Sequence, residues 1–215
     1  MKKLFIESIK KFIFNFTPFG APVYSYNLEP IQLSEIILSI EKTKELSGSI
    51  CEIGVARGMT TRFICEHLKS LNYNEKFFCI DTFSSFEKED VDFEIQNRQK
   101  SMEELRGFSY NNFERWKKNF EKFNFVKPIK ADIKKYDFKL ISPFKLVILD
   151  VDLYKPTIIA LNNLKKNMVS GGIIIVDDIK NNHAWDGAYQ AFNEFVNSNS
   201  YNYRIIGTKC GIINF

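Results

Sequence analysis

Residues 144–178, FKLVILDVDLYKPTIIALNNLKKNMVSGGIIIVDD, are the stretch that predicts the fold of this chain. Two apolar runs, Lys145–Leu149 and Ile173–Val176, each end abruptly in carboxylates. The segment between them has helical apolar periodicity and closes at Ser170-Gly171-Gly172. Strand, helix and strand form a βαβ unit, which places its two strands parallel. Continuous Val, Ile and Leu runs suit strands buried on both faces, so the sequence predicts an α/β fold.

Four carboxylates follow these two strands: Asp150 and Asp152 after the first, Asp177 and Asp178 after the second. If the strands are neighbours, the four side chains meet outside the carboxyl ends, where ligands bind in open α/β sheets. Like charges about 4 Å apart repel by roughly 4 kcal/mol at an effective dielectric near 20, so such a cluster needs a cation, protonation or diverging side chains. Oxygen ligands favour Mg²⁺, Ca²⁺ or Mn²⁺. The alternative is that Asp152 and one of Asp177 and Asp178 cap the following helices.

A second motif lies in residues 49–71, SICEIGVARGMTTRFICEHLKSL, which predict a strand, a turn at Gly54–Gly58 and a helix. Such a turn lets the backbone approach a ligand, and the helix start offers free N–H groups. The spacing is ExGxxxG, so the dinucleotide fingerprint fails at its second glycine. A strand at 76–80 then ends in Asp81, which either accepts hydrogen bonds from ribose hydroxyls or caps the next turn. Turn and acid together suggest a nucleoside-containing ligand.

Two further segments leave alternatives open. Residues 1–16 have apolar residues at helical spacing with lysines opposite, which fits a helix on a membrane, or one packed on its own domain or a subunit partner. Residues 82–122 are a polar, aromatic insertion with predicted helices at 96–105 and 111–123; it is either a lid or acceptor-binding wall, or a pair of surface helices. The other predicted elements are a loop at 17–27, a helix at 31–46, a strand at 125–130, a helix at 187–198 and a β-hairpin of strands 203–208 and 211–215.

Composition limits the class of protein. The 215 residues fit one domain with a substantial core, and the net charge of +4 is scattered, so nucleic-acid binding is not suggested. The cysteines form no CxxC pair and resemble small buried hydrophobes in a reducing compartment: Cys51, Cys65, Cys79 and Cys210. No apolar stretch is long enough to span a bilayer, and Glu7, Lys10 and Lys11 interrupt what begins like a signal peptide. We therefore expect a cytoplasmic protein.

Four segments in order, CEIGVARGMTT, FFCIDTF, LDVDLYKPTIIAL and SGGIIIVDD, resemble the macrocin-type (TylF-like) O-methyltransferases, class I enzymes that use S-adenosylmethionine. The resemblance covers roughly residues 48–196, including GAYQAF. It implies a Rossmann-like fold with a seven-stranded, mostly parallel sheet, helices on both faces and a reversed last strand, consistent with the C-terminal antiparallel hairpin. We expect a methyltransferase domain at 48–215, preceded by helices and a loop at 1–47 that cover the active site or an interface.

The resemblance also implies roles for individual residues. Those implied to bind the cofactor are Glu52, Gly54 and Gly58 at its methionine and sulfonium part, Asp81 with Thr82 or Ser84 at the ribose, and Asp132 beside the adenine. Those implied to bind Mg²⁺ or another divalent cation are Asp150, Asp177 and Asp178, with Asp152 as a further ligand or an orienter. The implied acceptor is a hydroxyl of a sugar in a glycan or natural product.

The expected reaction is metal-assisted methylation of that hydroxyl, because a divalent cation lowers the hydroxyl pKa and fixes its orientation. Asp150 is the preferred proton acceptor, and His183 is a second candidate that could instead be structural. The alternatives are a methyltransferase for a phenol, a phosphoryl oxygen or an amine, and a non-catalytic cofactor-binding scaffold. We expect a small-molecule or glycan partner, no nucleic acid, no membrane span and a possible homodimer.

Overall fold

The computed structural model describes residues 2–215, with side chains from residue 3 onward, so residue 1 of the expected 1–47 segment lies outside it. The strands are β1 (Ser49–Ile53), β2 (Phe77–Asp81), β3 (Val126–Lys130), β4 (Phe144–Leu149), β5 (Met168–Val176), β6 (Asn202–Ile206) and β7 (Cys210–Asn214). The α-helices are α1 (Lys2–Phe16), α2 (Pro30–Thr43), α3 (Met59–Ser70), α4 (Lys88–Arg98), α5 (Phe113–Phe120), α6 (Tyr154–Leu164) and α7 (Gly187–Asn199). Two 3₁₀ turns are η1 (Pro18–Gly20) and η2 (Phe138–Leu140).

All seven strands form one sheet in the order β3-β2-β1-β4-β5-β7-β6. The strands β1 to β5 pair in parallel, while β7 runs antiparallel to both β5 and β6. The chain winds outward from β1 to β3, returns to β4 beside β1, and then winds the other way. This arrangement confirms the predicted fold class and creates a topological switch point between β1 and β4.

The stretch that predicted the fold forms the centre of the sheet. Every residue of β4 is buried, as expected for a parallel strand covered on both faces. The register pairs Leu149 with Val176, so Asp150 and Asp177 follow at adjacent strand ends. The sheet therefore brings the two acidic strand ends together, as the sequence predicted.

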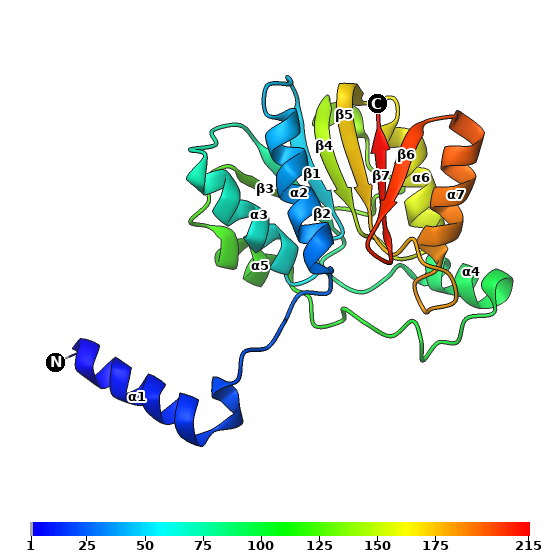
Figure 1. The fold of residues 1–215 in the computed structure, drawn as a ribbon. Coiled ribbons are helices and arrows are strands. Elements are labelled where there is room, and N and C mark those ends of the chain that lie inside the picture. Colours follow the sequence, from blue (N-terminus) through cyan, green and yellow to red (C-terminus); the bar gives the residue numbers. More distant parts are fainter. Residues whose placement is uncertain (1) are drawn as a thin grey trace.

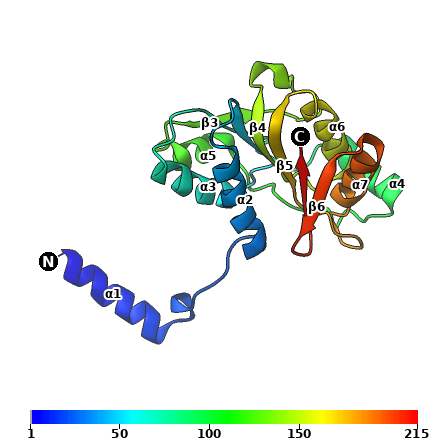
Figure 2. The same ribbon diagram turned by 45° about the horizontal axis from the view of Figure 1, so that its top comes forward.

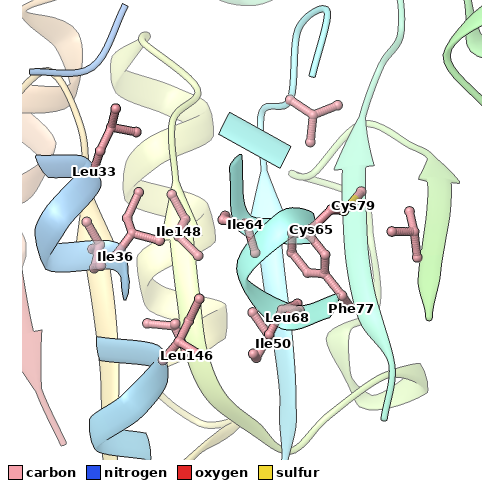
Figure 3. Packing of buried hydrophobic residues seen from close by; sticks show 14 of the residues in the cluster. Leu33, Ile36, Ile50, Ile64, Cys65, Leu68, Phe77, Cys79, Leu146 and Ile148 are labelled. Carbon is pink, nitrogen blue, oxygen red and sulfur yellow. The ribbon is translucent and has the colours of Figure 1, made fainter. Parts of the chain in front are cut away.

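Two hydrophobic layers cover the sheet (Figure 1). On one face, α2, α3 and α5 pack on alternate strand residues, and Figure 3 shows Ile36, Ile64 and Leu68 of these helices against Ile50 and Leu146. On the other face, α6 and α7 pack on the intervening residues. All four cysteines are buried and unpaired, which matches their predicted role as small core residues.

The helix α1 lies apart from the α/β body. Figures 1 and 2 show it projecting into solvent, joined to α2 by an extended connection. Its contacts with other elements are mainly with η1, the turn that immediately follows it. Across residues 2–215, none of the helices has the length and apolarity that crossing a bilayer requires.

Two predicted boundaries were wrong. The helix expected at 96–105 lies instead at Lys88–Arg98, and residues 99–112 form turns and irregular backbone. The strand expected at 173–176 begins earlier, at Met168, so Ser170-Gly171-Gly172 lies inside β5 rather than before it. The remaining strands and helices lie at or close to their predicted positions.

Candidate active site

A cavity of about 390 Å³ opens at the carboxyl ends of the central strands. Its walls come from the glycine turn after β1, the segment after β2, the ends of β4 and β5, and the loop before α2. Residues of the 82–122 insertion, Phe86, Asp90, Phe108 and Tyr110 among them, form one side. The cavity therefore lies at the switch point of the sheet, where ligands bind in folds of this kind.

The turn after β1 depends on a glycine at position 54. Gly54 has φ +82°, and a Cβ there would lie 1.6 Å from the carbonyl oxygen of Asp150. The turn can therefore cross the end of β4 only without a side chain. Gly58 has φ +88° and starts α3, with the ring of Phe120 packed against its Cα. Gly54 lines the cavity, whereas Gly58 packs against Phe120 and Trp116 and is not among the lining residues.

Asp81 joins the ends of β1 and β2. Its Oδ2 accepts hydrogen bonds from the N–H groups of Val55, at 2.8 Å, and Ala56, at 3.0 Å. Its Oδ1 accepts one from Phe83 N–H at 2.6 Å. The carboxylate thus caps its own turn, as the structural alternative proposed, and it also borders the cavity. A capping role and a ligand-binding role are compatible here, since each oxygen has more than one acceptor position.

Glu52, near the end of β1, is a buried acid beneath the cavity, with 1% of its surface exposed. The hydroxyl of Thr61 donates a 2.6 Å hydrogen bond to its Oε2. Burial raises the pKa of Glu52 to about 8, and the charge of Asp81 adds to the rise. The site therefore holds an acid that titrates near neutral pH, which is common in functional sites.

The carboxylates of Asp150, Asp177 and Asp178 meet as expected, each offering an oxygen within 4.8 Å of the others. Lys209, in the turn before β7, donates to Asp177 Oδ2 at 3.0 Å and to Asp178 Oδ1 at 2.7 Å. Gln32 of α2 donates to Asp177 Oδ1 at 2.6 Å. An ammonium group thus provides part of the positive charge that such a cluster requires.

Lys209 does not fully offset the repulsion among the clustered carboxylates. Burial, followed by the charges of Asp177 and Asp152, holds the pKa of Asp150 well above its ordinary value. Burial and the neighbouring Asp178 likewise raise the pKa of Asp152 and of Asp177. At neutral pH these groups therefore favour either bound protons or a further cation.

The helix-capping alternative for these acids is wrong. The N-cap of α6 is Leu153 and that of α7 is Asp186, and neither makes a side-chain capping bond. The donor set instead fits a hard divalent cation, because it offers only carboxylate oxygens at spacings compatible with one shared ion. Lys209 would then compete with that ion for Asp177 and Asp178.

The other expected site residues differ in their placement. Thr82, Ser84 and Asp132 border the cavity, and Asp132 Oδ1 accepts a hydrogen bond from Lys134 N–H at 3.0 Å. His183 is not among the residues that line the cavity, although its neighbour Trp185 is. His183 Nδ1 lies 3.4 Å from Trp185 N–H.

Sequence reasoning missed Lys209, Gln32 and an aromatic group beside the cavity. Trp185 lies with its ring centroid 5.4 Å from that of Phe86 and 6.3 Å from that of Phe108. Phe86 and Phe108 belong to the insertion, whereas Trp185 follows β5. These three aromatic residues are far apart in the sequence, so no local motif identifies them as a group. The prediction that the 82–122 insertion borders the site could have indicated that its aromatic residues lie there.

The model of the family described as macrocin-O-methyltransferase (TylF) matches residues 31–207. Among solved structures, the O-methyltransferase NovP aligns with a TM-score of 0.68 and 18% identity, over 85% of this chain and 78% of its own. The calicheamicin methyltransferase CalS11 aligns with a TM-score of 0.72 and 14% identity, over 100% of this chain and 93% of its own. These similarities show the class I methyltransferase fold. No curated protein matches the sequence.

Proposed function

Because the chain belongs to the macrocin O-methyltransferase (TylF) family, we propose that it methylates a hydroxyl of a sugar in a glycan or natural-product precursor, assisted by a divalent cation. Family membership makes it an S-adenosylmethionine-dependent methyltransferase. One observation carries the finer proposal. The acidic cluster after β4 and β5 borders the same cavity as the glycine turn and Asp81.

S-adenosylmethionine supplies a methyl group activated by a sulfonium charge. The turn at Gly54–Gly58 would hold its methionine part, Asp81 with Thr82 or Ser84 its ribose, and Asp132 its adenine. Glu52 lies below this turn, so its carboxylate form would offset the positive charge above it. The raised pKa of Glu52 means that binding a cation there would favour loss of its proton.

Asp150, Asp177 and Asp178 would hold the divalent cation, which would supply Lewis-acid chemistry for an acceptor hydroxyl. Asp150 is suited to take up the hydroxyl proton, because burial, together with the charges of Asp177 and Asp152, raises its pKa. The acceptor oxygen forms a bond to the methyl carbon as the carbon–sulfur bond breaks. Catalysis is then largely a matter of positioning, which the cavity walls would supply.

The relatives support a sugar as the acceptor class. A second structure of CalS11, described as TDP-rhamnose 3'-O-methyltransferase, aligns with a TM-score of 0.62 and 14% identity, over 100% of this chain and 94% of its own. The aromatic group of Phe86, Phe108 and Trp185 would offer a face on which a ring-shaped acceptor can pack. A phenolic acceptor uses the same surface and is the second class to test.

The deciding experiment is calorimetric titration of S-adenosylmethionine and S-adenosylhomocysteine, in Mg²⁺ and again in EDTA. We expect micromolar binding under both conditions. Asp81→Ala should weaken binding by about 1.5–3 kcal/mol, the value of a hydrogen bond to a charged group. Asp137→Ala is the matched control, because this exposed carboxylate caps η2 away from the cavity.

Turnover is then measured with nucleotide sugars, glycans and phenols as acceptors. We expect methylation of a sugar hydroxyl that EDTA suppresses and Mg²⁺ restores, and Asp178→Asn should abolish it while cofactor affinity stays nearly unchanged. Metal-independent turnover would remove the cation from the proposal, and turnover only with phenols would replace the sugar. Absence of cofactor binding would remove the basis of the methyltransferase proposal and would favour a scaffold protein or a different ligand.

A further inference from the structure

The first helix carries a large apolar surface that its own domain leaves uncovered. Every described side chain of α1 is exposed, including Phe5 at 68%, Phe12 at 60% and Phe16 at 74% of their surface. Both ribbon views show α1 clear of the α/β body (Figures 1 and 2). Large exposed apolar patches mark interaction sites, so α1 requires a binding partner.

These apolar side chains form a stripe along the helix. At about 100° per residue, six of them fall within an arc of roughly 120°. This apolar stripe consists of Phe5, Ile6, Ile9, Phe12, Ile13 and Phe16. Leu4 and Phe14 lie outside it. A stripe of bulky aromatic and branched residues is typical of helices that lie in a lipid–water interface.

Outside the stripe, the charged side chains of the helix are mainly basic. Among the described side chains of the helix, three are lysines, Lys3, Lys10 and Lys11, and one is acidic, Glu7. The Glu7 carboxylate lies 2.9 Å from Lys10 Nζ. This excess of positive charge is complementary to the anionic headgroups of a phospholipid surface.

Within residues 30–215, no single element presents a stripe of exposed large apolar side chains like that of α1. In the part of the chain after the connection to α2, the exposed large apolar side chains are distributed over separate elements. They include Ile31 and Leu38 on α2, Leu140 on η2, and Tyr203 and Ile205 on β6. A second copy of the body would therefore cover only a small part of the apolar stripe.

The connection after α1 allows the helix to lie flat on a surface. Beyond η1, residues 21–29 contain no helix or strand, and Ser25 and Asn27 already border the cavity. A helix bound to a surface would thus hold the active-site opening within a short connection of that surface.

We propose that α1 binds the surface of an anionic phospholipid bilayer. The apolar stripe enters the boundary between headgroups and acyl chains, while Lys3, Lys10 and Lys11 contact the phosphates. The helix lies in the plane of the interface. This inference concerns α1 and the lysines, and it stands whatever acceptor the enzyme uses.

The test is flotation of the full chain with vesicles of phosphatidylcholine alone and with 30% phosphatidylglycerol, a mixture of roughly physiological charge. We expect at least tenfold stronger binding to the anionic vesicles, weakened by high salt. Ile9→Asp with Phe12→Asp should abolish binding to both. Lys10→Glu with Lys11→Glu should remove the anionic preference, because each lysine near the surface contributes about fivefold.

Leu38→Asp is the matched control, since this side chain is 61% exposed on α2, outside the stripe, and the change should leave vesicle binding intact. Sedimentation velocity of the same proteins separates the lipid surface from a protein partner. Vesicle binding that the stripe variants retain would overturn the proposal. A second result would also overturn it: the wild type is a dimer and does not bind vesicles, and the Ile9→Asp, Phe12→Asp protein is a monomer. The apolar stripe would then bind a second copy of the chain.

Discussion

At the residue scale, the buried acid Glu52 makes stability depend on pH. Its pKa of about 8 in the native protein exceeds the value of 4.5 for an ordinary glutamate. The native state therefore keeps a proton that the unfolded chain releases above pH 4.5. The stabilising contribution of the protonated form is complete below that pH and is lost as pH rises through about 8.

Glu52→Gln should remove this dependence, because the neutral amide can still accept the hydrogen bond from Thr61. We expect the two proteins to have similar unfolding free energies near pH 5. Above pH 8 the variant should be more stable than the wild type by about 3 kcal/mol. Urea unfolding across this range measures the difference. The exposed Glu45→Gln is the control and should show no such trend; a flat difference for Glu52→Gln would disprove a raised pKa.

Lys209 should weaken metal binding, because its ammonium already contacts two of the three clustered carboxylates. Lys209→Met keeps the chain length and removes the charge. We expect this variant to bind Mn²⁺ at least tenfold more tightly, an effect of about 1.4 kcal/mol or more. It should unfold at a lower temperature in EDTA, because the carboxylates lose their cation.

Electron paramagnetic resonance of free Mn²⁺ gives the affinity, and thermal unfolding with and without Mn²⁺ gives the stability. Lys165→Met is the control: Lys165 hydrogen-bonds Asn199, away from the cluster. Equal Mn²⁺ affinity of the wild type and Lys209→Met would mean that Lys209 and the ion do not compete.

The two halves of this cluster differed in how well the sequence predicted them. Asp150 and Asp177 follow directly from the parallel pairing of β4 and β5, since each ends an apolar run. Lys209 comes from the antiparallel pairing of β7 with β5, which sets Gly211 opposite Val176. A lysine in a short hairpin turn has no distinctive spacing, so only the register of the reversed strand could place it beside the acids.

At the element scale, α4 is held by buried charges in addition to a small apolar cluster that contains Val91. Its buried residues are Asp90, Val91 and Glu94. Lys134 Nζ lies 2.7 Å from Asp90, and Glu94 accepts a 2.7 Å hydrogen bond from the first N–H of α6. Apolar periodicity cannot detect a helix whose buried face is acidic, which explains why its predicted position was wrong. The β4–α6–β5 unit, buried through apolar contacts, was predictable for the opposite reason.

Arg98, at the end of α4, should be a strong contributor to this attachment. It lies 2.6 Å from Glu94 and 2.7 Å from Asp186, the N-cap of α7, and it is mostly buried. Arg98→Ala leaves both acids in a low-dielectric environment without this partner. We expect a loss of about 3 kcal/mol in unfolding free energy, and a raised KM for the acceptor with little change in cofactor affinity.

Arg62→Ala removes the exposed pair with Glu66, in which both side chains are nearly half exposed. Exposed pairs contribute about 0.2–1 kcal/mol, so this variant should unfold close to the wild type. Chemical denaturation of the two variants in parallel makes the comparison. Equal losses would show that burial of the Arg98 pair has no special weight.

At the scale of the whole molecule, the structure divides into an α/β body and a first helix whose described side chains are all exposed. The body contains both hydrophobic layers and the entire cavity, whereas α1 adds no buried side chain to either layer. The sequence predicted an amphipathic helix over residues 1–16, and α1 forms at Lys2–Phe16. The sequence could not reveal where that helix lies, because an apolar stripe is the same whether it faces a domain, a partner or a lipid surface.

Deletion of residues 2–16 should therefore leave the body intact. We expect an unfolding temperature within about 2 °C of the wild type, because a change well below 1 kcal/mol moves it no further, and unchanged affinity for S-adenosylhomocysteine. Ile36→Ala is the contrast, since this α2 residue is fully buried against β4 and should cost about 2–5 kcal/mol. Scanning calorimetry compares the three proteins. A deletion as destabilising as Ile36→Ala would mean that α1 packs on the body in solution, and the helix would then be a structural element of the domain rather than a surface for a partner.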